Sequence, residues 1–273
     1  MSPLIDPEGL KAALAQPQPP IVLDCRARLD DRNAGLALWQ AGHIPGSHHL
    51  DMDRDLAATP GEGGRHPLPS PHAFTATLRR LDISPERGVV VYDDRGGQLA
   101  AARAWWMIGC WAGHPDVRVL DGGLPAWQAL AGPLTSSVPA TPAGSDWEPR
   151  FDNSQWLTAA DLLASASLRV DARGEARFGG EEEPIDPVAG HIPGAVCRPT
   201  GANLQADGRF KPAVELAQAL PQANEVTAYC GSGVSACHEI LAYAVAGLPR
   251  PRLYVGSWSD WIRDPARPVA TGQ

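Results

Sequence analysis

Lysine and cysteine are scarce in this chain. Only Lys11 and Lys211 are lysines, so arginine supplies nearly all of the 23 basic side chains. The planar guanidinium group of arginine is well suited to binding oxyanions. Five cysteines are spread over the chain: Cys25, Cys110, Cys197, Cys230 and Cys237. They are too few and too scattered for a disulfide scaffold, so each is expected to be a small buried side chain or a reactive thiol.

An excess of positive charge and long apolar segments are also missing. The formal net charge is −8, which argues against a nucleic-acid partner, because that binding needs a basic surface. No apolar run approaches the roughly 20 residues that span a bilayer, so no membrane partner is expected. The opening stretch MSPLIDPEGLKAAL lacks the basic start and apolar core of a secretory signal, so the expected location is the cytoplasm.

The chain repeats itself. Four segments of the first half recur in the same order in the second half: IVLDCRARLD (21–30) as LRVDARGEAR (168–177), AGHIPG (41–46) as AGHIPG (189–194), VVVYDDRGG (89–97) as VTAYCGSGV (226–234), and DGGLPAW (121–127) as VGSWSDW (255–261). Ordered matches of this kind indicate a duplicated domain. The sequence therefore predicts an N-terminal domain over 1–133, a linker rich in Pro, Ser, Thr and Gly over 134–155, and a C-terminal domain over 156–273.

Each half alternates short β-branched runs with helical stretches. The runs are nearly continuous in apolar character, which is typical of buried parallel strands. Helices are expected over 72–83, 99–112 and 235–248. This alternation predicts an α/β fold in which each domain has a mainly parallel sheet with helices on both faces.

The loop after the strand that ends at Tyr229 is the strongest candidate for a functional site. It reads Cys230-Gly231-Ser232-Gly233-Val234-Ser235 and leads into a helix, whereas the matching loop of the first half begins with Asp93. Two glycines permit a tight turn with positive φ angles. Backbone N–H groups and the start of the helix then favour a thiolate at Cys230. The alternatives are an inert buried cysteine and a metal site, but the Cys and His spacing matches no zinc pattern.

Tandem domains that each contain GHIPG, together with the C-terminal loop CGSGVS, resemble the sulfurtransferases of the rhodanese superfamily. The resemblance covers nearly the whole chain and implies two tandem rhodanese-like domains, the first without a loop cysteine. The CGSGVS form is similar to that of the 3-mercaptopyruvate sulfurtransferase branch. The thiosulfate branch usually carries CRKGVT, and Gly231 and Ser232 lack those basic side chains.

The resemblance also implies the partners of the catalytic Cys230. Ser232 would act in a proton relay with His66, from the HxLP motif, and with Asp53, from LDMD. Loop residues Gly231, Gly233, Val234 and Ser235 would line the substrate site. Independently, His66 lies in a long Gly- and Pro-rich loop (58–69) of a kind that is often functional. The alternatives are a surface-loop histidine at position 66 and a helix cap at position 53.

The resemblance assigns Arg177 to the substrate, since a guanidinium fork suits a carboxylate. The D-x-R arginines Arg26 and Arg173 recur in both halves and are expected to be structural. One departure concerns Pro184, which stands where the branch usually has a second substrate arginine. The surrounding segment EEEPIDP (181–187) is acidic and is expected to repel an anionic substrate. Either Arg95, Arg198 or another arginine substitutes, or the donor is not mercaptopyruvate.

The function implied is transfer of sulfur from 3-mercaptopyruvate, a small anionic donor, through a Cys230 persulfide to a thiol, thioredoxin or cyanide, with no metal or organic cofactor. The first alternative is thiosulfate:cyanide sulfurtransfer. Two further alternatives are a cysteine phosphatase or arsenate reductase and a non-catalytic binding module. The phosphatase loop ends in arginine, whereas here Ala236 and Cys237 follow the loop.

Overall fold

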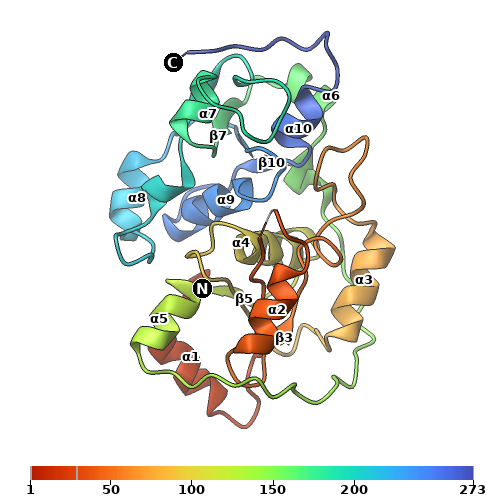
Figure 1. Cartoon of the computed structure of the whole chain (residues 1–273), viewed down its shortest axis with the longest axis vertical. Helices are drawn as coiled ribbons and strands as arrows, with labels where there is room; N and C mark the ends of the chain where they lie inside the picture. Colours follow the sequence, from red (N-terminus) through yellow and green to blue (C-terminus); the bar gives the residue numbers. More distant parts are fainter. Residues whose placement is uncertain (1, 29, 273) are drawn as a thin grey trace. The chain divides into compact units, whose positions relative to one another are not determined.

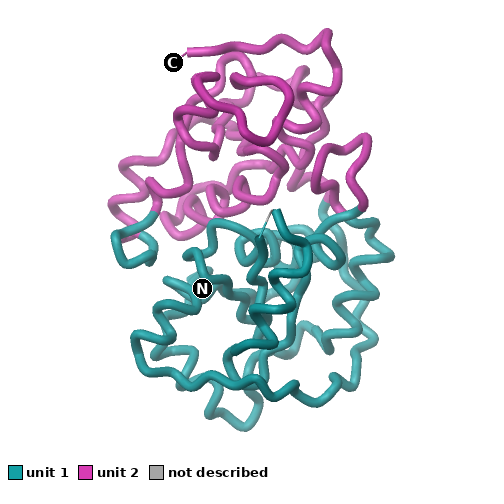
Figure 2. The backbone as a smooth tube through the Cα atoms, viewed as in Figure 1, with its two compact units in different colours: residues 1–58, 69–152, 204–210 teal, residues 59–68, 153–203, 211–273 magenta. Residues whose placement is uncertain are grey.

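The computed structural model describes residues 2–28 and 30–272 (Figure 1). Within this part, the chain divides into two compact units (Figure 2). Unit 1 comprises residues 1–58, 69–152 and 204–210, and unit 2 comprises residues 59–68, 153–203 and 211–273. Each unit therefore contains one short segment from the opposite half of the sequence. The predicted division at residues 134–155 stays a prediction.

Unit 1 contains a five-stranded sheet in the order β1-β5-β4-β2-β3, counted over the described residues. Every strand pairing in it is parallel. Its strands are β1 (Leu4–Ile5), β2 (Ile21–Asp24), β3 (His48–His49), β4 (Val89–Tyr92) and β5 (Val117–Leu120). Its helices are α1 (Pro7–Leu14), α2 (Ala34–Ala41), α3 (Pro71–Arg80), α4 (Ala100–Trp105) with the π-helical continuation η1 (Trp106–Trp111), and α5 (Gly123–Ala129).

Unit 2 repeats this sheet, again over the described residues, in the order β6-β10-β9-β7-β8 with parallel pairings throughout. Its strands are β6 (Trp156–Leu157), β7 (Leu168–Asp171), β8 (Ala195–Cys197), β9 (Val226–Tyr229) and β10 (Arg252–Tyr254). Its helices are η2 (Asn153–Gln155), α6 (Ala159–Ala164), α7 (Glu175–Gly179), η3 (Thr200–Asn203), α8 (Ala213–Ala219), α9 (Ala236–Val245) and α10 (Ser257–Trp261). The prediction of two mainly parallel sheets with helices on both faces is confirmed.

The helix ends follow from local sequence. Asp6 accepts a hydrogen bond from the N–H of Gly9 at the start of α1, and Ser70 accepts one from Ala73 at the start of α3. Proline occupies the first turn of both helices, where its missing N–H has no intrahelical partner to lose. Thr158 and Asp161 form a reciprocal capping box at the start of α6. These local signals explain where the three helices begin.

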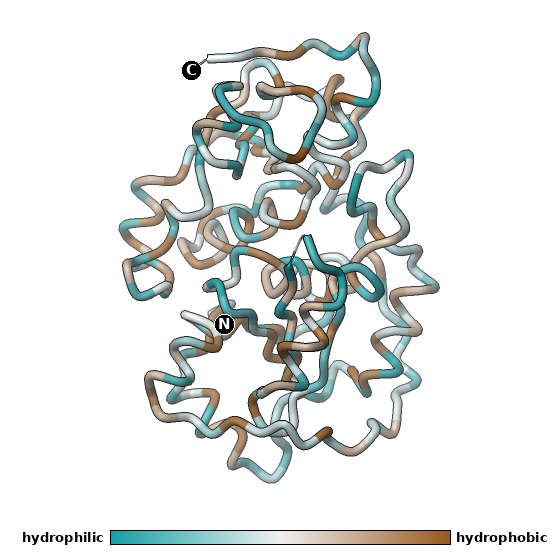
Figure 3. The backbone as a smooth tube through the Cα atoms, viewed as in Figure 1, coloured by the Kyte–Doolittle hydropathy of each residue, from teal (hydrophilic) through white to brown (hydrophobic). Residues whose placement is uncertain are grey.

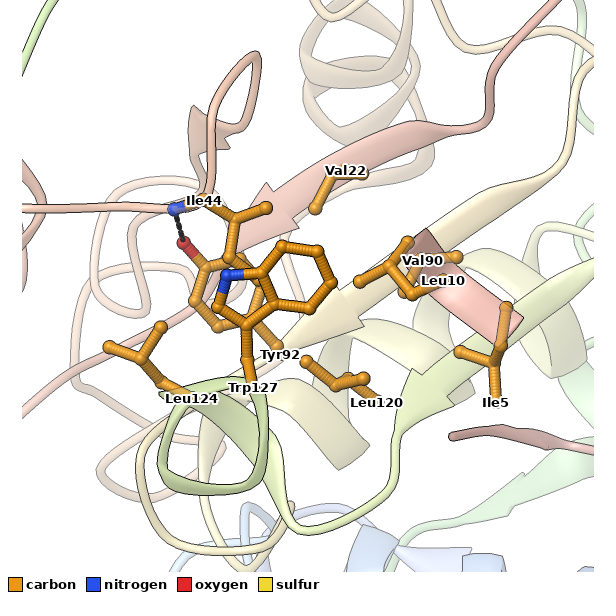
Figure 4. Packing of buried hydrophobic residues seen from close by; sticks show 9 residues of the cluster. All are labelled: Ile5, Leu10, Val22, Ile44, Val90, Tyr92, Leu120, Leu124 and Trp127. Atoms are coloured by element: carbon orange, nitrogen blue, oxygen red, sulfur yellow. Dashed lines mark hydrogen bonds between the residues drawn. The ribbon is translucent and has the colours of Figure 1, made fainter. Parts of the chain in front are cut away.

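One hydrophobic cluster of unit 1 joins residues of the sheet with residues of α1 and α5, and Figure 4 shows how their side chains pack. The cluster comprises Ile5, Leu10, Val22, Ile44, Val90, Tyr92, Leu120, Leu124 and Trp127. Helix α4 packs against β4 and β5. Because the central strand β4 is buried along its whole length, all four of its residues are apolar or aromatic.

Hydrophobic stretches along the chain are short (Figure 3), and no described helix has both the length and the apolar character needed to cross a membrane.

Equivalent hydrogen bonds within each unit explain the repeated motifs. Tyr92 Oη accepts a hydrogen bond from the N–H of Ile44 at 3.2 Å, and Tyr229 Oη accepts one from Ile192 at 3.2 Å. Both isoleucines lie within GHIPG. The contact therefore ties each GHIPG turn to the end of the central strand of its sheet.

The D-x-R arginines are structural, as predicted. Arg26 binds the carboxylate of Asp24 and donates to the carbonyl of Gly42 at 2.6 Å. Arg173 binds Asp171 and donates to the carbonyl of Gly190 at 2.6 Å. In each unit the arginine thus connects the end of a strand to the GHIPG turn.

Candidate active site

Cys230 directly follows β9, the central strand of unit 2. The chain runs from β7 outward to β8 on one side of β9, and from β9 to β10 on the other side. Loops therefore leave in opposite directions at this point of the sheet, which is where open α/β sheets place their ligands. The Cys230 side chain is 3% exposed.

The loop after Cys230 curls back on its sulfur. The N–H of Gly233 donates to Cys230 Sγ at 3.2 Å. The N–H of Cys230 donates to Ser257 Oγ at 3.1 Å, and its carbonyl accepts from the N–H of Trp258 at 2.9 Å. The start of α10 therefore holds the backbone of Cys230, and the loop places the N–H of Gly233 on its sulfur.

The two loop glycines serve different purposes, which corrects the expectation that both adopt positive φ angles. Gly233 has a φ of 78°, whereas Gly231 is not among the described glycines with positive φ. A Cβ atom on Gly231 would instead lie 2.8 Å from Arg65 Nη2 and 3.5 Å from Arg177 Nη1. Gly231 thus leaves room for the end of the Arg65 side chain, while the Arg177 contact would be an ordinary one.

Ser232 is hydrogen-bonded to His66. The distance between Ser232 Oγ and His66 Nδ1 is 2.8 Å, and Ser232 is 6% exposed. These two residues are the serine and the histidine that were predicted to interact. Both belong to unit 2, because this unit includes residues 59–68. A hydroxyl–imidazole pair beside a thiol can move a proton to or from a bound substrate.

The segment that supplies His66 is anchored to α10. The N–H of Arg65 donates to Ser259 Oγ at 3.1 Å. Gly64 has a φ of 91°, and a Cβ atom there would lie 2.6 Å from Ser259 Oγ and 2.8 Å from the carbonyl oxygen of Gly256. Only glycine allows the chain to approach α10 this closely with that backbone conformation.

Arg177 on α7 lies in an ionic network with two carboxylates of the acidic segment. Its Nη2 donates to Glu183 Oε1 at 2.7 Å and to Asp186 Oδ2 at 3.2 Å. Asp186 Oδ1 accepts a hydrogen bond from Arg65 Nη1. Burial acts to raise the pKa of Glu183, but the hydrogen bonds from Arg177 and two backbone N–H groups leave this pKa below its ordinary value.

The expectation that EEEPIDP repels an anionic substrate is therefore wrong for Glu183 and Asp186. Their side chains are 4% exposed and are bound to guanidinium groups, so their charge is compensated within the protein.

The two arginines named as possible substitutes at Pro184 have different surroundings. Arg198 pairs with Glu239 at 3.3 Å and donates to Asn203 at 2.9 Å, and Arg95 belongs to unit 1. Arg65 is the arginine that lies beside Arg177 at Gly231. Sequence reasoning did not select Arg65, although its position directly before His66 was a usable signal.

The remaining predicted residues have distinct surroundings. Val234 is buried, and Ser235 is the N-cap residue of α9 without a side-chain capping bond. Asp53 belongs to unit 1, where its carboxylate lies 3.6 Å from Arg32 Nε. Its part in the relay stays a prediction. Over the described residues, no group of three His, Cys, Asp or Glu side chains could hold a metal ion.

The matching loop of unit 1 shows what such a loop can bind. Asp93 Oδ1 accepts hydrogen bonds from the N–H groups of Arg95 and Gly97, both at 2.9 Å. Asp93 Oδ2 accepts longer ones, at 3.4 Å, from Leu99 and Ala101. A loop of this design gathers backbone N–H groups around an anion. In unit 1 the anion is a carboxylate of the protein, so no thiol chemistry is available there.

Comparison with known proteins agrees with this geometry. The rhodanese-like domain family matches twice, over residues 6–130 and 157–264. A probable 3-mercaptopyruvate sulfurtransferase of Pseudomonas aeruginosa is 46% identical over 98% of both chains. A putative thiosulfate sulfurtransferase, SseB, of Mycobacterium tuberculosis is 39% identical over 98% of this chain and 97% of its own length.

Solved structures show the same fold. The 3-mercaptopyruvate sulfurtransferase of Leishmania major matches with a TM-score of 0.85 at 27% identity, covering 97% of this chain and 76% of that one. SseA of Escherichia coli, described as a 3-mercaptopyruvate sulfotransferase, matches with a TM-score of 0.81 at 28% identity, covering 95% of this chain and all of that one.

Two parallel α/β units, one of which carries a cysteine loop at its switch point, define a tandem-domain sulfurtransferase. The chain belongs to the rhodanese superfamily and lies close to its 3-mercaptopyruvate sulfurtransferase branch. As a sulfurtransferase it takes sulfur from a donor and passes it to an acceptor.

Proposed function

We propose that this enzyme transfers sulfur from 3-mercaptopyruvate, through a persulfide on Cys230, to a thiophilic acceptor such as a thiol, thioredoxin or cyanide. The observation that carries the proposal is the hydrogen bond between Ser232 and His66 in the loop of the nucleophile. The sulfur of mercaptopyruvate leaves a carbon that must be protonated, and a proton relay beside the thiol meets that need. The cytoplasm stays the location expected from the sequence.

The first step forms an S–S bond and breaks a C–S bond. The thiolate of Cys230 attacks the donor sulfur, and the electron pair of the C–S bond passes to the organic product as the enolate of pyruvate. Ser232 gives a proton to the enolate carbon and recovers one from His66, and the proton carried by the transferred sulfur replaces it. The products are pyruvate and the Cys230 persulfide, with no external oxidant or reductant.

The second step restores the enzyme. A thiolate or cyanide attacks the outer sulfur of the persulfide, the S–S bond breaks, and its electron pair returns to Cys230 as a thiolate. The N–H of Gly233, which contacts Cys230 Sγ in the resting enzyme, is positioned to stabilise negative charge in this loop.

The donor carboxylate requires a binding group, and we assign it to Arg65 and Arg177. Both guanidinium groups lie next to Gly231, one residue from the nucleophile. Each offers planar N–H donors that match a carboxylate. Arg65 thus takes the part that an arginine at position 184 would have played.

Thiosulfate is the second candidate donor, because the Mycobacterium tuberculosis relative is named as a putative thiosulfate sulfurtransferase. The loop argues for mercaptopyruvate, since Gly231 and Ser232 bring no positive charge to a dianion.

A paired donor assay tests the proposal. The protein is incubated with each donor, and the mass of the Cys230 peptide is measured before and after cyanide. We expect one added sulfur that cyanide removes, loss of this adduct in Cys230→Ser, and its retention in Cys197→Ser. We also expect a higher kcat/KM with 3-mercaptopyruvate than with thiosulfate. The absence of an adduct with either donor would refute sulfur transfer through Cys230, and the reverse donor preference would refute the donor assignment.

A further inference from the structure

We propose that Asp186 is a specificity-determining residue, which compensates the charge of Arg65 and Arg177 so that the site favours donors with one negative charge over dianions. This inference rests on the function proposed above and extends it to the class of donor that the enzyme rejects.

Asp186 is the common partner of the two arginines at Gly231. One carboxylate oxygen accepts from Arg65 Nη1, and the other accepts from Arg177 Nη2 at 3.2 Å. The Asp186 side chain is 4% exposed. A buried carboxylate that bridges two guanidinium groups both orients them and cancels part of their charge.

The compensation of positive by negative charge extends to the ion pairs around Arg177 and Arg173. Arg177 also pairs with Glu183 at 2.7 Å. Arg173 pairs with Glu183 at 3.3 Å and with Asp171 at 2.7 Å. The connected groups are the guanidinium groups of Arg65, Arg173 and Arg177 and the carboxylates of Asp171, Glu183 and Asp186. Three positive and three negative charges leave the network formally neutral, although it presents guanidinium N–H groups at Gly231.

A neutral network of this kind distinguishes donors by their charge. The carboxylate of mercaptopyruvate carries one negative charge and can be satisfied by directional N–H donors. Thiosulfate is a dianion, and its second charge has no surplus positive charge to meet it in this network. An uncompensated charge in a poorly solvated site costs free energy. The loop residues Gly231 and Ser232 add no cation, so Asp186 controls the balance.

Replacing Asp186 by asparagine tests this idea because it keeps the shape of the side chain and removes one negative charge. We expect the ratio of kcat/KM for thiosulfate to kcat/KM for mercaptopyruvate to rise about tenfold or more, mainly through a lower KM for thiosulfate. Asp186→Glu keeps the charge and should leave the ratio near that of the unmodified enzyme.

Glu225→Gln is the matched control. It makes the same change in net charge at an exposed residue directly before β9, whereas Cys230 follows the other end of this strand. Its donor ratio should stay within about twofold of the unmodified enzyme, since exposed charges are screened by solvent.

Several outcomes would overturn the inference. An equal loss with both donors in Asp186→Asn would mean that Asp186 only supports the structure. If that variant does not fold, Glu183→Gln removes another negative charge from the same network, and an unchanged ratio there would contradict the inference. Failure of the proposed function looks different, because the unmodified enzyme would then gain no sulfur on Cys230 from mercaptopyruvate.

Discussion

At the scale of single residues, the two glycines in the loop of Cys230 have different roles. Gly233 has the left-handed φ that lets its N–H reach the sulfur, whereas Gly231 leaves room for the end of the Arg65 side chain. The turn requirement could be predicted from the sequence. The space requirement could not, because Arg65 lies far from this loop along the chain.

We expect Gly231→Ala and Gly233→Ala to fail in different ways. The first adds a methyl group near the movable end of Arg65, so donor KM should rise several-fold with little change in stability. The second places alanine at a φ of 78° and should cost about 1 kcal/mol or more in stability. Donor kinetics and urea unfolding of both variants provide the measurements. A purely structural role for Gly231 would appear as an unchanged KM.

We expect His66→Ala to affect the two donors unequally. Mercaptopyruvate leaves an enolate that needs a proton, whereas thiosulfate leaves sulfite, which needs none. The kcat/KM for mercaptopyruvate should fall about a hundredfold, and that for thiosulfate should fall much less. His72→Ala, on the exposed first turn of α3, serves as the control. Equal losses with both donors would argue against a relay through Ser232.

At the scale of elements, the loop between the central strand and the next helix contacts a different group in each unit. After β9 it surrounds a thiol, and after β4 it surrounds the carboxylate of Asp93. Burial raises the pKa of Asp93, against backbone hydrogen bonds that act to lower it. The repeat made this correspondence predictable, but the number of N–H groups around Asp93 depends on how the loop folds.

We expect Asp93→Ala to destabilise unit 1 by about 3 kcal/mol or more, because buried N–H groups lose their acceptor. Asp94→Ala is the neighbouring control. The Asp94 side chain is 21% exposed and pairs with a partly exposed Arg28, so its loss should cost less than about 1 kcal/mol. Thermal or urea unfolding compares the two, and similar losses would contradict the assignment of Asp93 as a buried acceptor.

Helix α9 carries a buried carboxyl that should make stability depend on pH. Burial raises the pKa of Glu239 to about 7, opposed by Asn203 and Arg198. A carboxyl that holds its proton more tightly when folded loses its stabilising contribution as pH rises through its folded pKa. Glu239→Gln should therefore gain stability relative to the unmodified protein between about pH 5 and about pH 8, by up to about 3 kcal/mol. Urea unfolding across this range tests it, and a difference that is constant with pH would contradict it.

At the scale of the whole molecule, each compact unit includes a short segment from the other half of the sequence. Residues 59–68 belong to unit 2, and residues 204–210 belong to unit 1, where the N–H of Phe210 donates to Asp121. The N-terminal half has Asp93 where the C-terminal half has the loop cysteine. Its sequence nevertheless supplies Arg65 and His66 to the unit that contains Cys230. Unit 2 therefore brings residues from both halves of the sequence together at the loop of Cys230.

We expect Gly64→Ala to weaken the attachment of segment 59–68 to α10, since the methyl group would meet Ser259 and Gly256 at a strained φ. Activity with mercaptopyruvate should fall more than tenfold, while thiosulfate still loads Cys230. Gly61→Ala is a control in the same segment, because the nearest atom to its Cβ would lie 3.9 Å away. Parallel assays of both variants test the point, and equal behaviour would contradict it.

The sequence by itself determined the repeated α/β units, the caps of their helices and the cysteine loop at the end of a central strand. These features depend on local periodicity, turn residues and order along the chain. Through a family resemblance it also led to the pairing of His66 with Ser232. Only the tertiary structure decided that Arg65 joins Arg177, that Asp186 bridges them and that the end of Arg65 lies beside Gly231. These contacts join residues far apart along the chain, 166 positions for His66 and Ser232 and 121 for Arg65 and Asp186, and local patterns carry no record of such distant partners.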